Sequence, residues 1–235
     1  MLEHQVATRE AWLEARKQLL AEEKEMTHLR DALAAKRRAL PWVKIDKPYR
    51  FDGPEGEASL SDLFGPRRQL IVYHFMFAPE WEQPCKSCSF WSDGVNGVLP
   101  HLEQRDTRFV AISRAPYEKL AARAKIAGYA FPWYSSGRSD FNYDFGVSFR
   151  PEDLAAGTTT YNYGPNTATI SDLPGASMFI KGDDGAIYHA YSSFARGLEM
   201  TNPAYQYLDL TPLGRHEDGL TFPMEWVRLR EDYAA

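Results

Sequence analysis

Apolar residues recur at seven-residue intervals along the first part of the chain. Residues 8–40 contain neither glycine nor proline and are rich in Ala, Leu, Glu, Lys and Arg, so they predict one long helix or two consecutive helices that end at Pro41. An apolar stripe follows this segment, formed by Trp12, Leu19, Met26, Leu33 and Leu40. Its pattern is equally typical of a helix packed on its own domain and of an arm that docks on a second copy to form a homodimer.

Two uninterrupted apolar runs, residues 69–77 (QLIVYHFMF) and 108–113 (RFVAIS), predict strands that are buried on both faces of a sheet. Residues 89–104 predict an interrupted helix, and residues 117–128 predict an Ala-rich helix that ends at a glycine. The order strand, helix, strand, helix indicates parallel strands joined by a helical crossover. By contrast, residues 41–66 are typical of a loop with one short helical turn near residues 59–64.

The last clear pattern in the chain predicts a hairpin. The runs ASMFIK and AIYHAY flank the turn sequence Gly-Asp-Asp-Gly at residues 182–185. A parallel pair followed by an antiparallel hairpin predicts the α/β class, with a thioredoxin-like mixed sheet, flanking helices and a long N-terminal helical arm. We expect the arm to span residues 1–40 and the thioredoxin-like domain residues 41–235, with an insertion near residues 150–172.

The formal net charge of −5 disfavours binding to nucleic acid and to anionic membranes. The chain contains no apolar run of membrane-spanning length, and its N-terminal residues are charged throughout, so we expect a cytoplasmic protein. Its partner is then expected to be a small molecule or another protein.

The two cysteines of the chain, Cys85 and Cys88, follow the first predicted strand and begin a predicted helix. Free amide groups at a helix N-terminus stabilise a thiolate, so Cys85 is predicted to be the attacking nucleophile and Cys88 the thiol that resolves the mixed disulfide. This pattern predicts thiol-disulfide exchange with a protein or small-molecule disulfide and requires no organic cofactor.

Other interpretations of the pair are two small buried side chains or half of a zinc site. Zinc needs two more ligands, and the candidates His74, His101 and His189 have no paired ligand spacing, so no metal site is predicted. Trp81 and Trp91 flank the dithiol, and they either shape a groove for a substrate or simply pack against the sheet. His189 is a further candidate for substrate binding or proton transfer.

The segments WLEARKQLLAEEKEMTHLRD, LPWVKIDKPYRFDGPEG, YHFMFAPEWEQPCKSCSFWSD, SMFIKGDDGAIYHAYSSFARG, YLDLTPLGR and PMEWVRL carry a resemblance that runs nearly end to end. They are similar to a bacterial thioredoxin-like family catalogued as domain of unknown function 899 and sometimes labelled dithiol-disulfide isomerase. The resemblance implies a thioredoxin-like fold and supplies no reaction.

Residues 81–86 (WEQPCK) resemble the thioredoxin run Trp-Cys-Gly-Pro-Cys-Lys, but this alignment puts Glu82 at the nucleophile and Cys85 at the resolving position. The substrate-binding cis-proline of thioredoxins also has no direct counterpart, because Pro174 lies four residues before Met178. Peroxiredoxins carry Thr or Ser where this chain has Glu82. Three functions therefore stay open: a thiol-disulfide oxidoreductase, a peroxiredoxin-like peroxidase that oxidises Cys85 to a sulfenic acid, and a redox-inactive binding or assembly protein.

Overall fold

The computed structural model describes residues 4–233, and the chain divides into two compact units, Met1–Pro41 and Trp42–Ala235. The first unit holds helix α1 (Arg9–Arg38), which confirms the predicted helix as a single one. Thr8 caps it, because its hydroxyl accepts a hydrogen bond from the Ala11 amide at 3.2 Å. No side chain of α1 is buried, and the apolar stripe is 45% exposed at Leu40 and 57% exposed at Met26.

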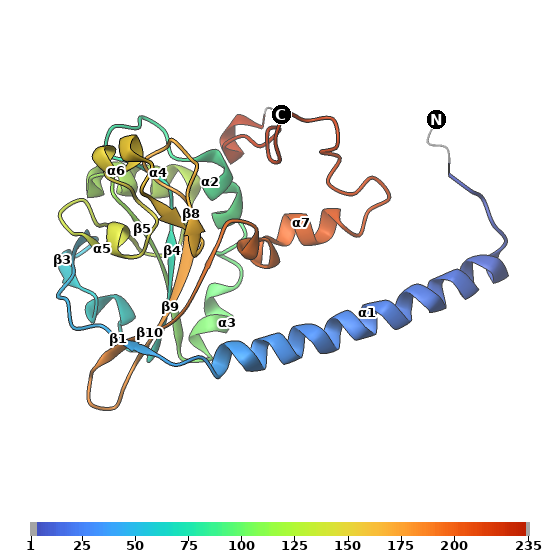
Figure 1. Ribbon diagram of the computed structural model, residues 1–235, viewed down its shortest axis with the longest axis horizontal. Coiled ribbons are helices and arrows are strands. Elements are labelled where there is room, and N and C mark those ends of the chain that lie inside the picture. Colours follow the sequence, from blue (N-terminus) through green and yellow to red (C-terminus); the bar gives the residue numbers. More distant parts are fainter. Residues whose placement is uncertain (1–3, 234–235) are drawn as a thin grey trace. The chain divides into compact units, whose positions relative to one another are not determined.

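The second unit is built on an eight-stranded sheet with the order β1-β10-β9-β4-β5-β6-β2-β3. Its centre consists of β4 (Gln69–His74), β5 (Thr107–Ser113), β6 (Trp133–Ser135), β9 (Gly175–Lys181) and β10 (Ile187–Phe194). The first three run parallel, and the β9–β10 hairpin joins them antiparallel through β4 (Figure 1). This arrangement confirms the predicted α/β class and the thioredoxin-like fold.

The loop predicted for residues 41–66 is wrong, because this segment extends the sheet at both edges. Strand β1 (Val43–Lys44) pairs with β10, and the hairpin of β2 (Arg50–Gly53) and β3 (Gly56–Ser59) pairs with β6. Such short edge strands show too few alternating residues for a periodic signal. The predicted helical turn is present as the 3₁₀ helix η1 (Asp62–Phe64).

Helices on both faces complete this unit: α2 (Lys86–Ser92), α3 (Leu99–Glu103), α4 (Tyr117–Ala127), α5 (Phe141–Asp144), α6 (Pro151–Ala156), α7 (Pro203–Leu208), and the 3₁₀ helices η2 (Ala195–Thr201) and η3 (Arg230–Asp232). The single helix predicted for residues 89–104 is two, since turns that include Gly94 and Gly97 separate α2 from α3. No helix among residues 4–233 is long and apolar enough to cross a membrane.

Adjacent residues of the central strands enter different core clusters, one on each face of the sheet. Val72 packs with Phe64 and Phe141, whereas Tyr73 packs with Trp91 of α2 and with other buried aromatic side chains. Side chains alternate between faces along a strand, so both faces of β4 are buried. The continuous apolar run that predicted this strand therefore reflects its central position.

The segment predicted as an insertion, residues 150–172, is ordered. It contains α6 and a small separate hairpin of β7 (Thr160–Tyr161) and β8 (Gly164–Pro165). Its end is fixed to the main sheet by Asp172, whose carboxylate accepts hydrogen bonds from the Arg114 guanidinium at 2.9 and 2.6 Å.

Candidate active site

Cys85 and Cys88 lie on the first turn of α2, where they follow the end of β4. Cys85 is the N-cap of the helix, and its carbonyl accepts the first helical hydrogen bond from the Ser89 amide at 3.0 Å. The Met76 carbonyl accepts from the Cys85 amide at 3.1 Å, and the Met76 amide donates to Cys88 Sγ at 3.5 Å. Both thiols are free, with Cys88 buried and Cys85 partly exposed. Met76, which follows β4, therefore holds both cysteines through its backbone.

The two thiols differ in acidity because of the hydrogen bond between them. The Cys88 thiol donates to the Cys85 sulfur, which lowers the pKa of Cys85 to about 6 although burial opposes this, and the Cys88 and Ser87 amides add to the lowering. Burial and the neighbouring Cys85 raise the pKa of Cys88 well above its ordinary value. At neutral pH the pair therefore presents one thiolate, Cys85, and one thiol, Cys88.

Tyr73 is a member of this site that the sequence analysis missed. Its buried hydroxyl is hydrogen-bonded to Cys88, and this contact, unlike burial, favours the Cys88 thiolate. The only signal in the sequence was a phenol within an otherwise apolar strand. Cys88 therefore has two hydrogen-bond donors at its sulfur, the Tyr73 hydroxyl and the Met76 amide.

A cavity of ≈ 110 Å³, here called the dithiol pocket, opens beside the cysteines and is largely apolar. It is lined by Tyr73, Met76, Cys85, Ser87, Cys88, Trp91, Pro174, Ala195, Arg196, Leu198, Glu199 and Met224. Trp91 belongs to this wall, and its indole donates to Thr201 Oγ1 at 2.8 Å. Trp81 is not part of the lining; it packs at the edge of the core cluster, and its carbonyl accepts from Lys119 Nζ at 3.0 Å.

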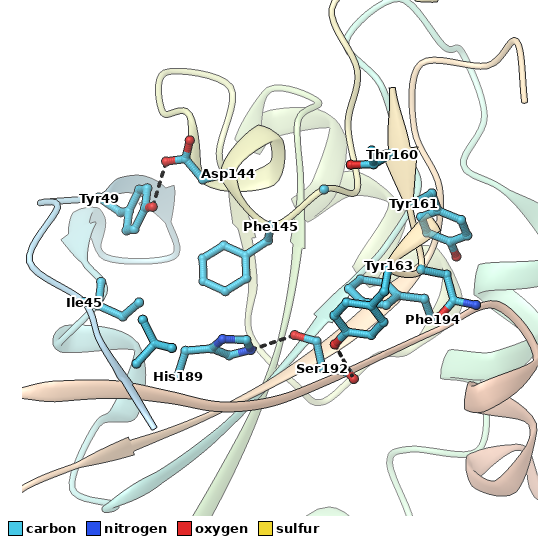
Figure 2. A pocket seen from close by; sticks show the side chains of 13 residues that line it. Ile45, Tyr49, Asp144, Phe145, Thr160, Tyr161, Tyr163, His189, Ser192 and Phe194 are labelled. Carbon is cyan, nitrogen blue, oxygen red and sulfur yellow. Dashed lines mark hydrogen bonds between the residues drawn. The ribbon is translucent and has the colours of Figure 1, made fainter. Parts of the chain in front are cut away.

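The structure places His189 away from the cysteines, in a different cavity that shares no lining residue with the dithiol pocket (Figure 2). His189 Nε2 lies 2.7 Å from Ser192 Oγ. Ser192 Oγ in turn lies 2.8 Å from Ser177 Oγ, and Ser177 Oγ lies 2.8 Å from His74 Nε2. Both histidines are thus engaged in a buried chain of hydrogen bonds across β4, β9 and β10.

The one-turn shift suggested by the Glu82 alignment is absent, because α2 begins at Lys86 and Cys85 itself occupies the N-cap. Lys86 Nζ donates to the Glu225 carbonyl at 2.9 Å, and the main causes of the lowered pKa of Cys85 are hydrogen bonds from Cys88 and Ser87. Among residues 4–233 no three His, Cys, Asp or Glu side chains are grouped so that they hold a metal ion.

A mixed sheet with parallel β4, β5 and β6, an antiparallel β9–β10 hairpin and helices on both faces defines a protein of thioredoxin-like fold, and Cys85 and Cys88 lie on the first turn of the helix that follows its central strand. The chain belongs to the family described as bacterial protein of unknown function, domain of unknown function 899, whose model matches residues 1–233.

Solved structures with a similar course of the chain include peroxiredoxins. Peroxidoxin BcpB from Mycobacterium tuberculosis is 12% identical, with a TM-score of 0.46, over 71% of this chain and 96% of that one. Peroxiredoxin Q from Xanthomonas campestris is 15% identical, with a TM-score of 0.44, over 73% and 98%. AhpC from Enterococcus faecalis is 15% identical, with a TM-score of 0.43, over 70% and 91%. No curated protein matches the chain.

Proposed function

We propose that this protein is a thiol-disulfide oxidoreductase in which Cys85 attacks a protein or small-molecule disulfide and Cys88 resolves the product. The observation that supports this most directly is the hydrogen bond from the Cys88 thiol to the Cys85 sulfur, which lowers the pKa of Cys85 to about 6. Most Cys85 is then thiolate at neutral pH, and the thiolate is the form that attacks disulfides.

In the first step, the Cys85 thiolate forms a bond to one sulfur of the substrate and the substrate disulfide breaks. The departing thiolate takes up a proton, and the other half of the substrate stays on Cys85 as a mixed disulfide. Cys88 then loses its proton and attacks Cys85 Sγ, which releases the second substrate thiolate. The substrate gains two electrons, and the protein ends with a Cys85–Cys88 disulfide that an external dithiol reduces.

The second step needs a thiolate at a buried position, and the surroundings of Cys88 support it. The hydroxyl of Tyr73 and the amide of Met76, at 3.5 Å, both direct a proton at the Cys88 sulfur. Hydrogen bonds to the charged form stabilise that form, so these donors offset part of the cost of burial when Cys88 ionises. Tyr73 is therefore proposed to assist resolution and not the initial attack.

The dithiol pocket, at ≈ 110 Å³, is smaller than the roughly 300 Å³ at which drug-sized ligand sites begin. We infer that it holds only the apolar group next to the reacting sulfur, with Trp91 as one wall, while the rest of the substrate stays outside. A reducing cytoplasm would keep the dithiol ready for such a reaction.

A peroxidase is a second candidate, and the small size of the dithiol pocket favours it, because a hydroperoxide fits where a larger substrate does not. Here Cys85 would take one peroxide oxygen to become a sulfenic acid while water or an alcohol leaves. The Cys88 thiol would then condense with the Cys85 sulfenic acid to form the disulfide, with loss of one water.

The test is to mix the reduced full-length protein with oxidised glutathione or with hydrogen peroxide and to follow loss of thiols, with the Cys85→Ser variant as control. The oxidoreductase predicts a reversible intramolecular disulfide with glutathione disulfide and none in the variant. Faster oxidation by dilute peroxide than by the disulfide would select the peroxidase. Thiols inert to both would select a redox-inactive binding protein and overturn the proposal.

A further inference from the structure

A second and larger cavity lies in the unit Trp42–Ala235, between β10, the β7–β8 hairpin and the end of α5 (Figure 2). Its volume of ≈ 380 Å³ exceeds the ≈ 110 Å³ of the dithiol pocket, and the two share no lining residue. Cavities of about 300 to 1,000 Å³ are typical of small-molecule sites. This cavity, here called the ring pocket, plays no part in the proposed thiol chemistry.

Five aromatic side chains line it: Tyr49, Phe145, Tyr161, Tyr163 and Phe194. Contacts among these rings and with His189 fix their positions. The Phe145 ring meets His189 edge-on with centroids 5.2 Å apart, and the rings of Tyr161 and Tyr163 lie 5.5 and 5.6 Å from that of Phe194. Rings held in this way offer flat apolar surface at a low entropic cost on binding.

The turn between β7 and β8 holds Tyr163 in an unfavourable backbone conformation. Asn162 and Tyr163 have φ values of 51° and 63°, in the left-handed region that bulky residues rarely adopt. Tyr163 is 80% exposed, yet its hydroxyl donates to the Ser192 carbonyl at 3.1 Å across the pocket. The strain is therefore maintained by a contact that keeps the ring of Tyr163 over the cavity.

The floor of the ring pocket is formed by His189 and Ser192. They belong to a chain of hydrogen bonds whose donors and acceptors can be assigned. His189 donates one ring N–H to the backbone of Tyr191, which leaves Nε2 to accept from the Ser192 hydroxyl at 2.7 Å. Ser192 then accepts from Ser177, and Ser177 accepts from His74 Nε2. The Ser192 proton and both ring nitrogens of His189 are thus committed within the protein.

Other hydroxyl protons around the cavity are also committed, those of Tyr49 to Asp144 at 2.7 Å and of Tyr161 to the Pro174 carbonyl at 2.6 Å. The lining contains no Lys or Arg, and its one ionised group is the carboxylate of Asp144. Lys47 and Tyr49 both bind Asp144 Oδ2, whereas Oδ1 accepts no hydrogen bond from the described residues. The ring pocket therefore offers aromatic faces, acceptors and, at Thr160 and Asn162, two uncharged side chains with donors, and it has no cation in its lining.

From this combination we propose that the ring pocket binds a small planar ring compound that is uncharged or cationic and carries N–H or O–H donors, and that it rejects anions. An anion would lose its hydration without gaining a positive charge from the lining, and it would face the Asp144 carboxylate. A ring compound with donors stacks on the aromatic walls and bonds to the free acceptors, and a cation gains further from the ring faces.

Benzamidinium, benzamide and benzoate test this proposal because they have nearly the same shape and differ in charge. Each is titrated into the full-length protein while the amide NMR signals are followed. We expect saturable shifts around Tyr163 and Ser192, with benzamidinium binding at least as tightly as benzamide and benzoate at least about tenfold more weakly than benzamide. Benzoate affinity equal to that of benzamide, or shifts that never saturate, would overturn the proposal.

Tyr163→Asn removes one ring without disturbing the turn, because asparagine tolerates left-handed φ values. This variant should bind benzamide about tenfold more weakly, and Asp144→Asn should remove any preference for benzamidinium over benzamide. Tyr207→Asn, the same change at a tyrosine that is 73% exposed and outside the lining, should leave binding unchanged. Cys85→Ser should also bind benzamide normally, so the test of the ring pocket does not depend on the thiol chemistry. Unaltered binding in Tyr163→Asn would show that the ligand does not bind in the ring pocket.

Discussion

Cys88 controls the acidity of Cys85 as a hydrogen-bond donor, since its thiol is the largest cause of the lowered pKa. We predict that Cys85 in the wild-type protein is alkylated by iodoacetamide with a pH midpoint near its pKa of about 6. Cys88→Ala removes the donor and should raise this midpoint by more than one pH unit, towards the ordinary thiol value of about 8.5. Cys88→Ser keeps a hydroxyl donor and is the matched control, expected to stay near the wild type. Equal midpoints in the two variants would contradict this role.

His74 makes stability depend on pH because it is buried in its neutral form. Burial lowers its pKa from 6.5 to about 3, so below pH 6.5 the unfolded chain binds a proton that the folded protein refuses. The stabilisation is complete above pH 6.5 and declines as the pH falls towards 3. Between pH 7 and pH 4.5 this one group should cost about 2 to 3 kcal/mol.

Urea unfolding at pH 7 and pH 4.5 measures this cost, with His74→Gln as the comparison. The variant is less stable at pH 7, because the chain to Ser177 is altered, but its loss of stability on acidification should be smaller than that of the wild type by the same amount. If both proteins lose equal stability, His74 is not held neutral in the folded protein.

At the scale of single residues, the sequence was sufficient to place the cysteine pair at the start of a helix, because spacing and position after a buried strand are local properties. It was not sufficient to locate Tyr73, which meets Cys88 only when β4 and α2 pack together. Nor did it separate His189 from the dithiol. The pairing register of β10 and the position of the β7–β8 hairpin decide which cavity His189 lines, and neither is a local property of the sequence.

The segment at residues 150–172 depends on one buried ion pair. The side chains of Arg114 and Asp172 are 12% and 4% exposed, and Asp172 also accepts hydrogen bonds from the hydroxyls of Ser148 and Ser171. Asp172→Asn should lower the free energy of unfolding by about 3 to 5 kcal/mol, because it leaves the guanidinium buried without its counter-charge.

Asp46 provides the control, since its ion pair with Lys44 is exposed on both sides. Asp46→Asn should leave the denaturation midpoint within experimental error. A small effect of Asp172→Asn, comparable with that of the control, would mean that the segment is held by its other contacts.

For whole elements, prediction succeeded where the periodic signal was long and failed where pairing came from distant partners. Helix α1 and strands β4, β5, β9 and β10 were predicted within a few residues. The edge strands β1, β2 and β3 were not, because each has four residues or fewer and is defined by the strand beside it. The helix predicted for residues 89–104 is divided at turns that contain glycine. Glycine alone did not predict the break, because packing decides whether a helix continues through a glycine.

At the scale of the whole chain, all buried residues of the two core clusters belong to the unit Trp42–Ala235. We therefore predict that a protein of residues 42–235 folds by itself, with a thermal midpoint within about 2 °C of that of the full chain and the same rate of Cys85 alkylation. Calorimetry and alkylation kinetics on both proteins test this. A drop of many degrees, or exposure of Cys88 to the reagent, would show that residues 1–41 are needed for the core.

The central claim is that Cys85 attacks and Cys88 resolves, and trapping of the intermediate tests it most directly. Each single Cys→Ser variant is incubated at pH 7 with a disulfide-linked peptide, quenched with acid and analysed by mass spectrometry. The predicted result is a stable mixed disulfide on Cys85 in the Cys88→Ser protein and none in the Cys85→Ser protein, because attack occurs without resolution. A mixed disulfide that accumulates on Cys88 in the Cys85→Ser protein, with none in Cys88→Ser, would contradict the account.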